Sequence, residues 1–302
     1  MKAARIIWLI GALLSVAALS ASATPQWSLP DDVKSVEVNS YDMAYREMGS
    51  GPPLLLIHGA LNDYRYWNDQ FPAFSPTYRT IAVSLRHYYP EKWDGNGGGF
   101  SIDQHVADVA SFIQVLHLGK VNLLGHSRGG AVALNVAKEH PDLIKTLILE
   151  DAGGLETLLP DTPESQKLAT EARETANTLK ANLAKGDVDS AARGFIDSLG
   201  GPGTWAKRTP AQRQIILDNM TTAAVDAGDR PPISCDQIRK FDFPILLING
   251  ERSPKRFGEM FAAMRHCKDI SVPVVIPDAA HAMNRENPAA FNTAVLGFLA
   301  KN

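Results

Sequence analysis

A serine flanked by glycines is the first group in this chain that could do covalent chemistry. The segment LLGHSRGGAVAL holds Gly125, Ser127 and Gly129 in the spacing G-x-S-x-G, directly between an apolar run and a helical pattern. Glycines at these places permit a sharp strand-to-helix turn that exposes the serine hydroxyl. The N-terminus of the following helix favours negative charge nearby. The pattern therefore predicts that Ser127 is a nucleophile.

A serine hydroxyl needs a base nearby before it attacks a carbonyl carbon. The chain has 8 histidines, and His281 lies in PDAAHAMNRENP, between the last apolar run and the final helical pattern. We expect His58, in the His-Gly that follows the first buried run, to orient a loop. His126, inside the serine turn, is expected to be a supporting residue. The sequence therefore favours His281 as the base.

Apolar runs that alternate with helical patterns must position these groups. Short apolar runs indicate buried strands, and apolar residues at helical spacing indicate amphipathic helices. The alternation predicts an α/β protein whose mostly parallel sheet carries helices on both faces. The expected strands lie within 52–59, 78–86, 120–127, 144–151, 243–250 and 273–281, and the expected helices within 101–118, 129–141, 253–267 and 288–301.

One region interrupts this alternation. Residues 156–232 contain no good strand pattern, but three helical patterns at 163–186, 188–199 and 209–228. We therefore expect a helical lid over 156–232, inserted between a first core part at 24–155 and a second at 233–302. The length of 302 residues suffices for such an arrangement.

The N-terminus is typical of an exported protein. Lys2 and Arg5 precede an apolar run from Ile6 to Leu19, and small residues follow up to Ala23. This order indicates a secretory signal peptide over residues 1–23, with the mature chain beginning near Thr24. The run is shorter than the roughly 20 residues that span a bilayer. We expect a periplasmic or secreted protein with no stable membrane span after cleavage.

Charge and cysteine content narrow the classes of partner. The formal net charge is −3, and it becomes −5 once Lys2 and Arg5 are removed. Because no basic stripe is present, nucleic acid is not expected as a partner. Cys235 and Cys267 are the 2 cysteines. In an exported protein they can form a disulfide, and they can equally remain two separate buried thiols.

Taken together, these motifs resemble the α/β-hydrolase fold superfamily, in its lid-bearing branch of esterase- and lactonase-like serine hydrolases. The likeness covers roughly residue 53 to the C-terminus outside the inserted helices. It rests on the first His-Gly, on GHSRGG, on HPDLIKTLILED and on AAHAMNRENPAAF. The resemblance implies an oxyanion hole made by the backbone N–H groups of Ala60 and Arg128.

The resemblance also raises the question of where the acid of a catalytic triad lies. Many members place an aspartate three residues after a late strand glycine, but here Ser253 stands three residues after Gly250. Other members place an acid 24 residues after the nucleophile, at the end of the strand that follows the helix after the serine turn. Here that position is Asp151. The resemblance therefore implies Asp151 as the acid.

Three other carboxylates remain alternatives to Asp151. Glu251 lies one residue after Gly250, and its longer side chain could reach His281. Glu150 is disfavoured because neighbours on a strand point to opposite faces. Asp278, close to His281 in sequence, is expected to shape the loop.

The expected function is that of an exported serine hydrolase acting on a small, fairly apolar ester, lactone or related carbonyl compound. The same residues could cleave a carbon–carbon bond beside a ketone, or run acyl transfer or perhydrolysis. A rival of another class is a non-catalytic, ligand-binding or receptor-like module. We expect a small-molecule substrate and no metal or organic cofactor. Dehalogenase and epoxide-hydrolase chemistry is disfavoured because position 127 is not a carboxylate.

Overall fold

The apolar runs form the centre of an 8-stranded sheet in the computed structural model, which describes residues 27–226 and 228–302. The strand order is β1-β2-β4-β3-β5-β6-β7-β8, and the strands from β4 to β8 are parallel. The strands are β1 Lys34–Val38, β2 Tyr41–Met48, β3 Pro53–Ile57, β4 Arg79–Val83, β5 Val121–His126, β6 Ile144–Glu150, β7 Ile245–Gly250 and β8 Val274–Ile276.

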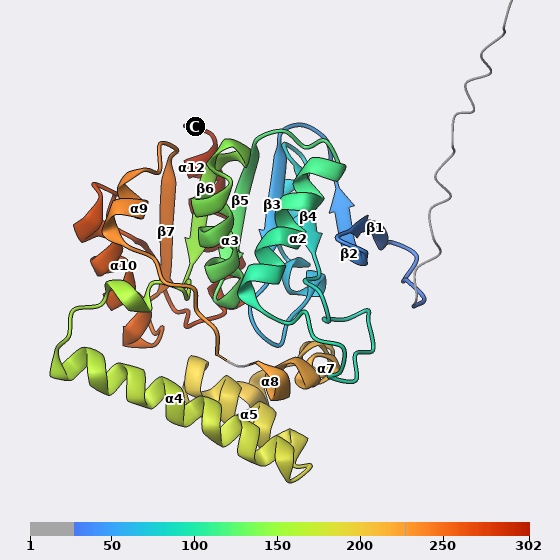
Figure 1. The fold of residues 1–302 in the computed structure, drawn as a ribbon, viewed down its shortest axis with the longest axis vertical. Coiled ribbons are helices and arrows are strands. Elements are labelled where there is room, and N and C mark those ends of the chain that lie inside the picture. Colours follow the sequence, from blue (N-terminus) through green and yellow to red (C-terminus); the bar gives the residue numbers. More distant parts are fainter. Residues whose placement is uncertain (1–26, 227) are drawn as a thin grey trace, which may run out of the picture.

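Helices cover both faces of this sheet, as the alternating pattern predicted (Figure 1). Three short 3₁₀ turns, η1 Tyr64–Trp67, η2 Pro141–Leu143 and η3 Glu156–Leu158, join the larger elements. The helices are α1 Phe71–Phe74, α2 Ile102–Val115, α3 Arg128–Glu139, α4 Pro163–Ala184, α5 Val188–Gly200, α6 Thr204–Lys207, α7 Pro210–Asp218, α8 Met220–Val225, α9 Cys235–Arg239, α10 Lys255–Cys267, α11 Met283–Glu286 and α12 Pro288–Leu299.

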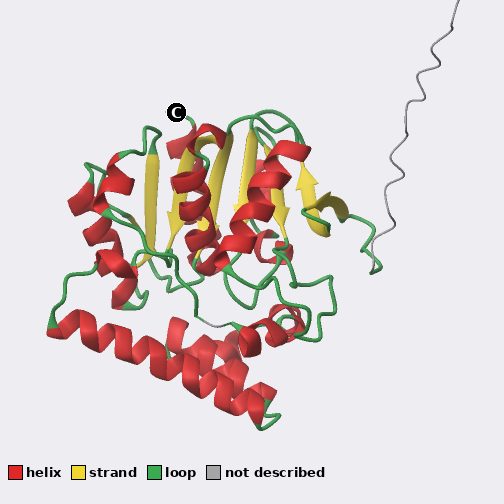
Figure 2. Ribbon diagram, in the orientation of Figure 1, coloured by secondary structure: helices red, strands yellow, loops and turns green. Residues whose placement is uncertain are grey.

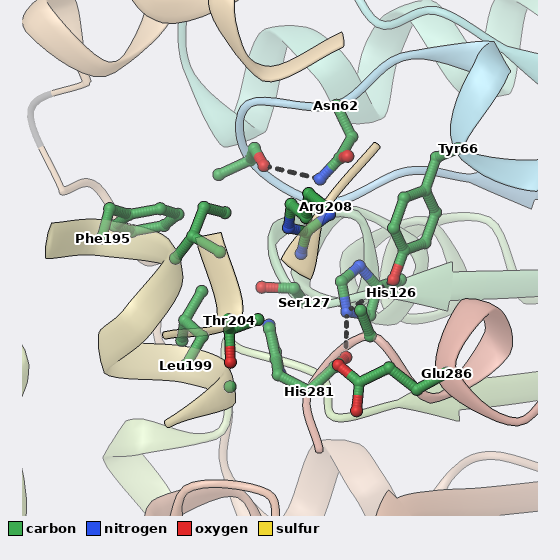
Figure 3. A pocket seen from close by; sticks show the side chains of 14 residues that line it. Asn62, Tyr66, His126, Ser127, Phe195, Leu199, Thr204, Arg208, His281 and Glu286 are labelled. Atoms are coloured by element: carbon green, nitrogen blue, oxygen red, sulfur yellow. Dashed lines mark hydrogen bonds between the residues drawn. The ribbon is translucent and has the colours of Figure 1, made fainter. Parts of the chain in front are cut away.

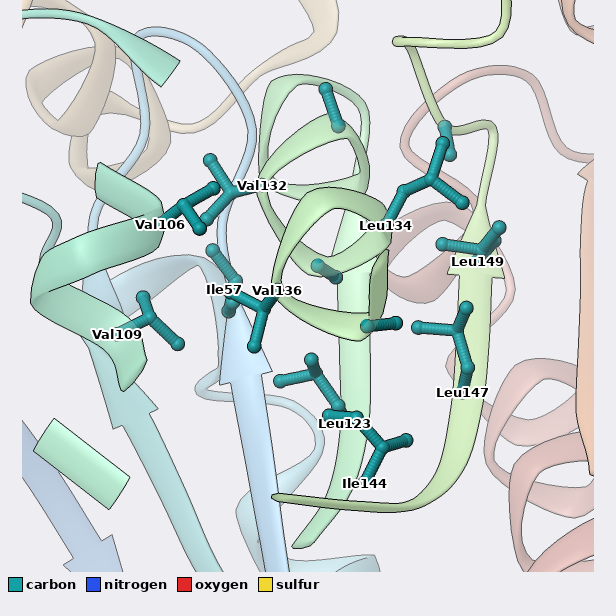
Figure 4. Close-up of a cluster of buried hydrophobic side chains, with 14 of the residues drawn as sticks. Ile57, Val106, Val109, Leu123, Val132, Leu134, Val136, Ile144, Leu147 and Leu149 are labelled. Atoms are coloured by element: carbon teal, nitrogen blue, oxygen red, sulfur yellow. The ribbon is translucent and has the colours of Figure 1, made fainter. Parts of the chain in front are cut away.

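The central strands are apolar throughout because both of their faces are buried. In β3, Leu55 and Ile57 join the core under α2 and α3, whereas Leu54 and Leu56 join the core under α12. This division follows from the two-residue alternation of a strand. Figure 4 shows the first core, where side chains of α2 and α3 interlock with those of β3, β5 and β6.

A hairpin at the edge of the sheet was not predicted. Strands β1 and β2 pair antiparallel with each other, and β2 pairs antiparallel with β4. The two residues between them, Asn39 and Ser40, have φ values of 49° and 59°. Left-handed conformations at both positions are typical of a tight two-residue hairpin turn. The Asn-Ser pair between alternating residues was the signal that could have predicted it.

The region between β6 and β7 is helical, and we call residues 156–232 the inserted helices. Figure 2 shows this helical layer below the strands, at the edge where the parallel strands end. The predicted third helix divides at Asn219 into α7 and α8, and the short α6 precedes it. None of the described helices is long and apolar enough to cross a bilayer. The inserted helices therefore face the carboxyl edge of the sheet, where parallel sheets carry their sites.

A disulfide between Cys235 and Cys267 joins the start of α9 to the end of α10. The sequence left open whether these cysteines pair. The bond closes a loop with a sequence separation of 32 residues. It therefore ties the first helix after the inserted helices to the core.

Reduction of this disulfide is expected to lower the free energy of unfolding by about 3 to 4 kcal/mol, because it frees a loop of that length in the unfolded chain. Urea unfolding of oxidised and reduced protein, followed by circular dichroism, measures the difference. A double Cys235→Ser/Cys267→Ser variant should match the reduced protein and be insensitive to reductant. Equal unfolding midpoints for the oxidised and reduced protein would contradict the expectation.

Candidate active site

Ser127 lies in a strained turn between β5 and α3. Its φ of 52° and ψ of −117° lie outside the regions that side chains normally favour. The flanking glycines are sterically required, since a Cβ at Gly129 would lie 2.3 Å from the His58 carbonyl oxygen. A Cβ at Gly125 would lie 2.4 Å from the Gly129 carbonyl oxygen. The turn places the Ser127 side chain at a pocket that His281 also lines (Figure 3).

His281 lies in the loop between β8 and α11, and three contacts fix its position. Its Nδ1 is 2.9 Å from Oδ2 of Asp151. Its ring stacks on Phe257 of α10, with 4.5 Å between the ring centroids. Its carbonyl oxygen lies 2.9 Å from Nε2 of His126, the residue of the serine turn that was expected to be a supporting residue. Because Nδ1 is occupied by Asp151, Nε2 is the ring nitrogen left for Ser127.

Asp151 is fully buried at the end of β6 and is the carboxylate that contacts His281. Asn249 Nδ2 donates to its Oδ1 at 2.7 Å, and Ser253 Oγ donates to its Oδ2 at 2.5 Å. The strand order explains this meeting, because β6 and β7 are adjacent and β8 lies next to β7. The carboxyl ends of these strands therefore bring the donors and the histidine to one buried carboxylate.

The alternative carboxylates are engaged elsewhere. Glu251 is exposed and accepts the Asp278 N–H at 2.9 Å. Asp278 is itself exposed and lies 3.5 Å from Arg252. Glu150 is buried and accepts the Asn284 N–H at 3.3 Å. Burial, followed by the nearby charge of Asp151, holds the pKa of Glu150 well above its usual value. The geometry therefore favours Asp151 over the three alternatives.

Ser253 takes part in the site although it replaces the more common acid. The Gly250 N–H donates to Ser253 Oγ at 3.0 Å, which leaves the hydroxyl hydrogen free for Asp151. A hydroxyl donor stabilises the ionised form of a carboxylate. Sequence reasoning saw Ser253 as a missing acid and did not anticipate that it supports the acid of the neighbouring strand.

Burial and hydrogen bonding shift the pKa of Asp151 in opposite directions, and burial also shifts the pKa of His281. Burial raises the pKa of Asp151 to about 7, and the bonds from Ser253 and Asn249 act against it. Burial lowers the pKa of His281 well below its usual value, and the charges of Arg256 and Arg208 lower it further. The imidazole therefore stays neutral, as a base must, to a lower pH than a free histidine.

Replacing Ser253 with alanine is expected to raise the pKa of Asp151, because a donor to the ionised form is lost. Activity requires the carboxylate, so the acid limb of the kcat/KM profile should move to higher pH by about one unit. A pH profile of ester hydrolysis from pH 5 to 9 measures the shift. Arg252→Gln, an exposed change on the same turn, serves as the control. An unmoved acid limb in Ser253→Ala would show that this donor does not act on Asp151.

The N–H groups of Ala60 and Arg128 lie where an oxyanion hole was expected. Within 27–226 and 228–302, no backbone bond of the turns and loops uses either N–H as donor. His58 orients the first of them. Its Nε2 accepts the Leu85 N–H at 3.1 Å, so its Nδ1 donates to the Gly59 carbonyl at 2.8 Å. Because C=O and N–H of a trans peptide point in opposite directions, this bond also orients the Ala60 N–H.

The Arg128 side chain contacts the end of the inserted helices. Its buried Nη1 lies 3.2 Å from Asp226 Oδ2 and 3.7 Å from Asp229 Oδ1. The guanidinium also lies 4.8 Å from the Phe100 ring centroid. The sequence left open whether this side chain is a surface group or a contact to the inserted segment, and the structure shows the second. Residue 128 thus links the serine turn to the segment that covers it.

Two cavities meet at Ser127. The larger has a volume of about 760 Å³ and lies between the inserted helices and the core, with Leu159, Leu179, Phe257 and Met260 in its walls. The smaller contains Ser127, His281 and polar groups such as Arg208. No group of three or more His, Cys, Asp or Glu side chains in the described part of the chain is arranged to hold a metal ion.

Comparison with known proteins agrees with this architecture. The sequence pattern of the alpha/beta hydrolase family matches residues 54–294. The chain belongs to the alpha/beta hydrolase family. The match includes Ser127, Asp151 and His281 and spans the inserted helices.

Several hydrolases resemble this family member over most of its length. It is 25% identical over 270 residues to (E)-2-((N-methylformamido)methylene)succinate hydrolase of Acinetobacter baylyi, covering 86% of this chain and 95% of that one. It is 25% identical over 283 residues to 2-(acetamidomethylene)succinate hydrolase of Mesorhizobium japonicum, covering 88% and 94%. A malate-bound esterase structure from Thermogutta terrifontis matches with a TM-score of 0.70 and 27% identity, covering 89% and 97%.

Proposed function

We propose that this alpha/beta hydrolase is a serine hydrolase that cleaves a small, fairly apolar ester, lactone or related carbonyl compound. The observation that carries the proposal is the 2.9 Å contact between Asp151 and His281, beside a serine held in a strained turn. A buried Asp–His pair next to a serine hydroxyl that faces a pocket is the arrangement that activates serine for acyl transfer. The similar esterase from Thermogutta terrifontis supports the same reaction class.

The reaction follows from the positions of these groups. Ser127 Oγ attacks the carbonyl carbon while its proton passes to Nε2 of His281. The N–H groups of Ala60 and Arg128 stabilise the oxyanion, which develops only in the transition state and the intermediate. The leaving group takes the proton from His281, and water activated by the same nitrogen releases the acyl group. Asp151 stabilises the imidazolium at Nδ1 throughout.

The inserted helices are proposed to act as a lid that selects the substrate. They form one wall of the larger cavity, and most of the surface in that cavity is apolar. An apolar wall over the nucleophile favours apolar substrate groups and excludes water that would compete with them. The similar hydrolases are named for different substrates. They therefore support hydrolysis as the reaction, and the substrate has to be inferred from the residues of this chain.

A panel of p-nitrophenyl esters and lactones tests the proposed function. Purified protein should hydrolyse short-chain members well above the rate in buffer, and a fluorophosphonate should block that activity with first-order kinetics. Absence of turnover across the panel, together with absence of fluorophosphonate labelling, would support the non-catalytic, ligand-binding alternative instead.

We also propose that the protein is exported and that residues 1–23 are removed. This segment lies outside the described residues. The disulfide between Cys235 and Cys267 supports the proposal, because such bonds persist in oxidising compartments. Intact-mass analysis of protein from the periplasm or medium should give a chain that begins near Thr24. Recovery of exported protein that still begins at Met1 would contradict it.

A further inference from the structure

Two arginines that form no ion pair with a described carboxylate line the small pocket of Ser127 or the cavity next to it. Arg208 follows α6 in the inserted helices, and Arg285 lies in α11, just after His281. Buried Nε of Arg208 and buried Nη1 of Arg285 have no hydrogen-bond partner among the described residues. A guanidinium is charged at every physiological pH, so its enclosed N–H groups require an acceptor. Both side chains are only partly buried, but the enclosed nitrogen of each guanidinium lacks an acceptor that a bound anion could supply.

The position of Arg208 connects this charge to the reaction site. Arg208 lines the small pocket together with Ser127 and His281, and Figure 3 shows its side chain beside Ser127. Burial lowers the pKa of Arg208, and the nearby charge of Arg285 lowers it further. Arg208 in turn contributes to the lowered pKa of His281. Arg285 therefore acts on Arg208, and Arg208 acts on the base, so an anion bound beside the two arginines would offset the repulsion at Arg208.

A neighbouring cavity of about 380 Å³ extends the same positive region. It shares Arg208, Thr204 and Glu286 with the small pocket, and Arg285 lines it as well. Four cations and two carboxylates border this cavity, namely Lys207, Arg208, Arg252 and Arg285 against Asp278 and Glu286. Asp278 pairs with Arg252, and Glu286 accepts the Ala280 N–H at 2.6 Å. Cations therefore outnumber carboxylates around this cavity, and neither Arg208 nor Arg285 forms an ion pair with a described carboxylate.

We propose that the substrate carries a carboxylate, which binds to Arg208 and Arg285 while its scissile carbonyl lies at Ser127. A guanidinium presents N–H groups in a planar fork that matches a carboxylate. The apolar part of the substrate then occupies the larger cavity on the other side of Ser127. The inference deepens the proposed function and rests on it for the place of the carbonyl. The proposed substrate is the half-ester, or an equivalent carbonyl derivative, of a short dicarboxylic acid.

Binding to a protein without the nucleophile tests this directly. Calorimetry on Ser127→Ala should show that monomethyl succinate, glutarate or adipate binds at least roughly 10-fold more tightly than the dimethyl ester of the same acid. Adding Arg208→Gln should weaken binding of the half-ester by roughly 10- to 100-fold and leave the diester unchanged. Arg208→Lys should give an intermediate loss, because it keeps the charge without the fork. Arg193→Gln, an exposed arginine of the inserted helices, is the matched control.

Two results would overturn the proposal. One is that none of the three half-esters binds more tightly than its diester. The other is that Arg208→Gln leaves half-ester binding unchanged while the circular dichroism spectrum shows a folded protein. Because Ser127→Ala performs no chemistry, these binding measurements do not test the reaction, and neither result contradicts the proposed serine hydrolase. Failure of fluorophosphonate labelling in the wild-type protein would instead reject the proposed function and leave the binding result intact.

Discussion

Ser127→Ala is expected to abolish ester hydrolysis, lowering kcat by at least roughly 10⁵-fold, while the protein remains folded. The loss is large because no other hydroxyl occupies the strained turn between β5 and α3 from which Ser127 faces the pocket. The strain of the turn should remain, because alanine keeps the Cβ that causes it, so the variant should be about as stable as the wild type. Turnover of p-nitrophenyl esters and thermal unfolding measure the two effects.

The control for this variant is a substitution at another residue that lines the small pocket. Thr204→Val removes a hydroxyl from the same pocket without touching the Asp–His pair, and it should keep most of the activity. Hydrolysis by Ser127→Ala at more than a few per cent of the wild-type rate would show that another group is the nucleophile.

Asp151→Asn is expected to lower kcat by roughly a thousandfold or more. The amide of this variant could no longer stabilise the imidazolium, and it would favour the wrong tautomer of His281. The donors Asn249 and Ser253, which now face a carboxylate, would face a neutral amide instead. Steady-state kinetics on a neutral ester give the ratio of kcat values. The KM should change little, because Asp151 is fully buried and does not face the substrate.

Two companion variants separate Asp151 from its rivals. Glu251→Gln should retain activity within a fewfold of the wild type, because Glu251 is exposed and bonds the Asp278 N–H. Ser253→Asp should restore part of the activity lost in Asp151→Asn, since Ser253 Oγ lies 2.5 Å from the carboxylate oxygen that meets His281. Collapse of activity in Glu251→Gln with near-normal turnover in Asp151→Asn would assign the acid to Glu251.

Local patterns in the sequence were enough to predict the central strands, the main helices and the turn at Ser127. Apolar runs predicted the central strands because both faces of each strand are buried, and G-x-S-x-G at a strand-to-helix junction predicted the turn at Ser127. The hairpin of β1 and β2 was missed because it lies at the sheet edge, where 8 of its 13 strand residues are exposed or only partly buried and the apolar signal is weak.

The environment of the acid could not be derived from local patterns alone. Asp151 and His281 are 130 residues apart, and their contact depends on the order of β6, β7 and β8 in the sheet. The sequence offered Asp151 only through a resemblance, and it gave no sign that Ser253 and Asn249 would donate to it. Likewise, nothing in the helical pattern of the inserted segment indicated that Arg208 would turn toward the pocket. Side-chain direction across elements is a tertiary property.

Peptide mapping after fluorophosphonate treatment tests the central claim most directly. A tryptic digest of the wild-type protein should place the covalent adduct on the peptide from Val121 to Arg128, at Ser127. Labelling should slow by roughly a thousandfold in Asp151→Asn, because the serine is then poorly activated. An adduct on any other residue, or the absence of an adduct in folded wild-type protein, would contradict the assignment of Ser127 as the nucleophile.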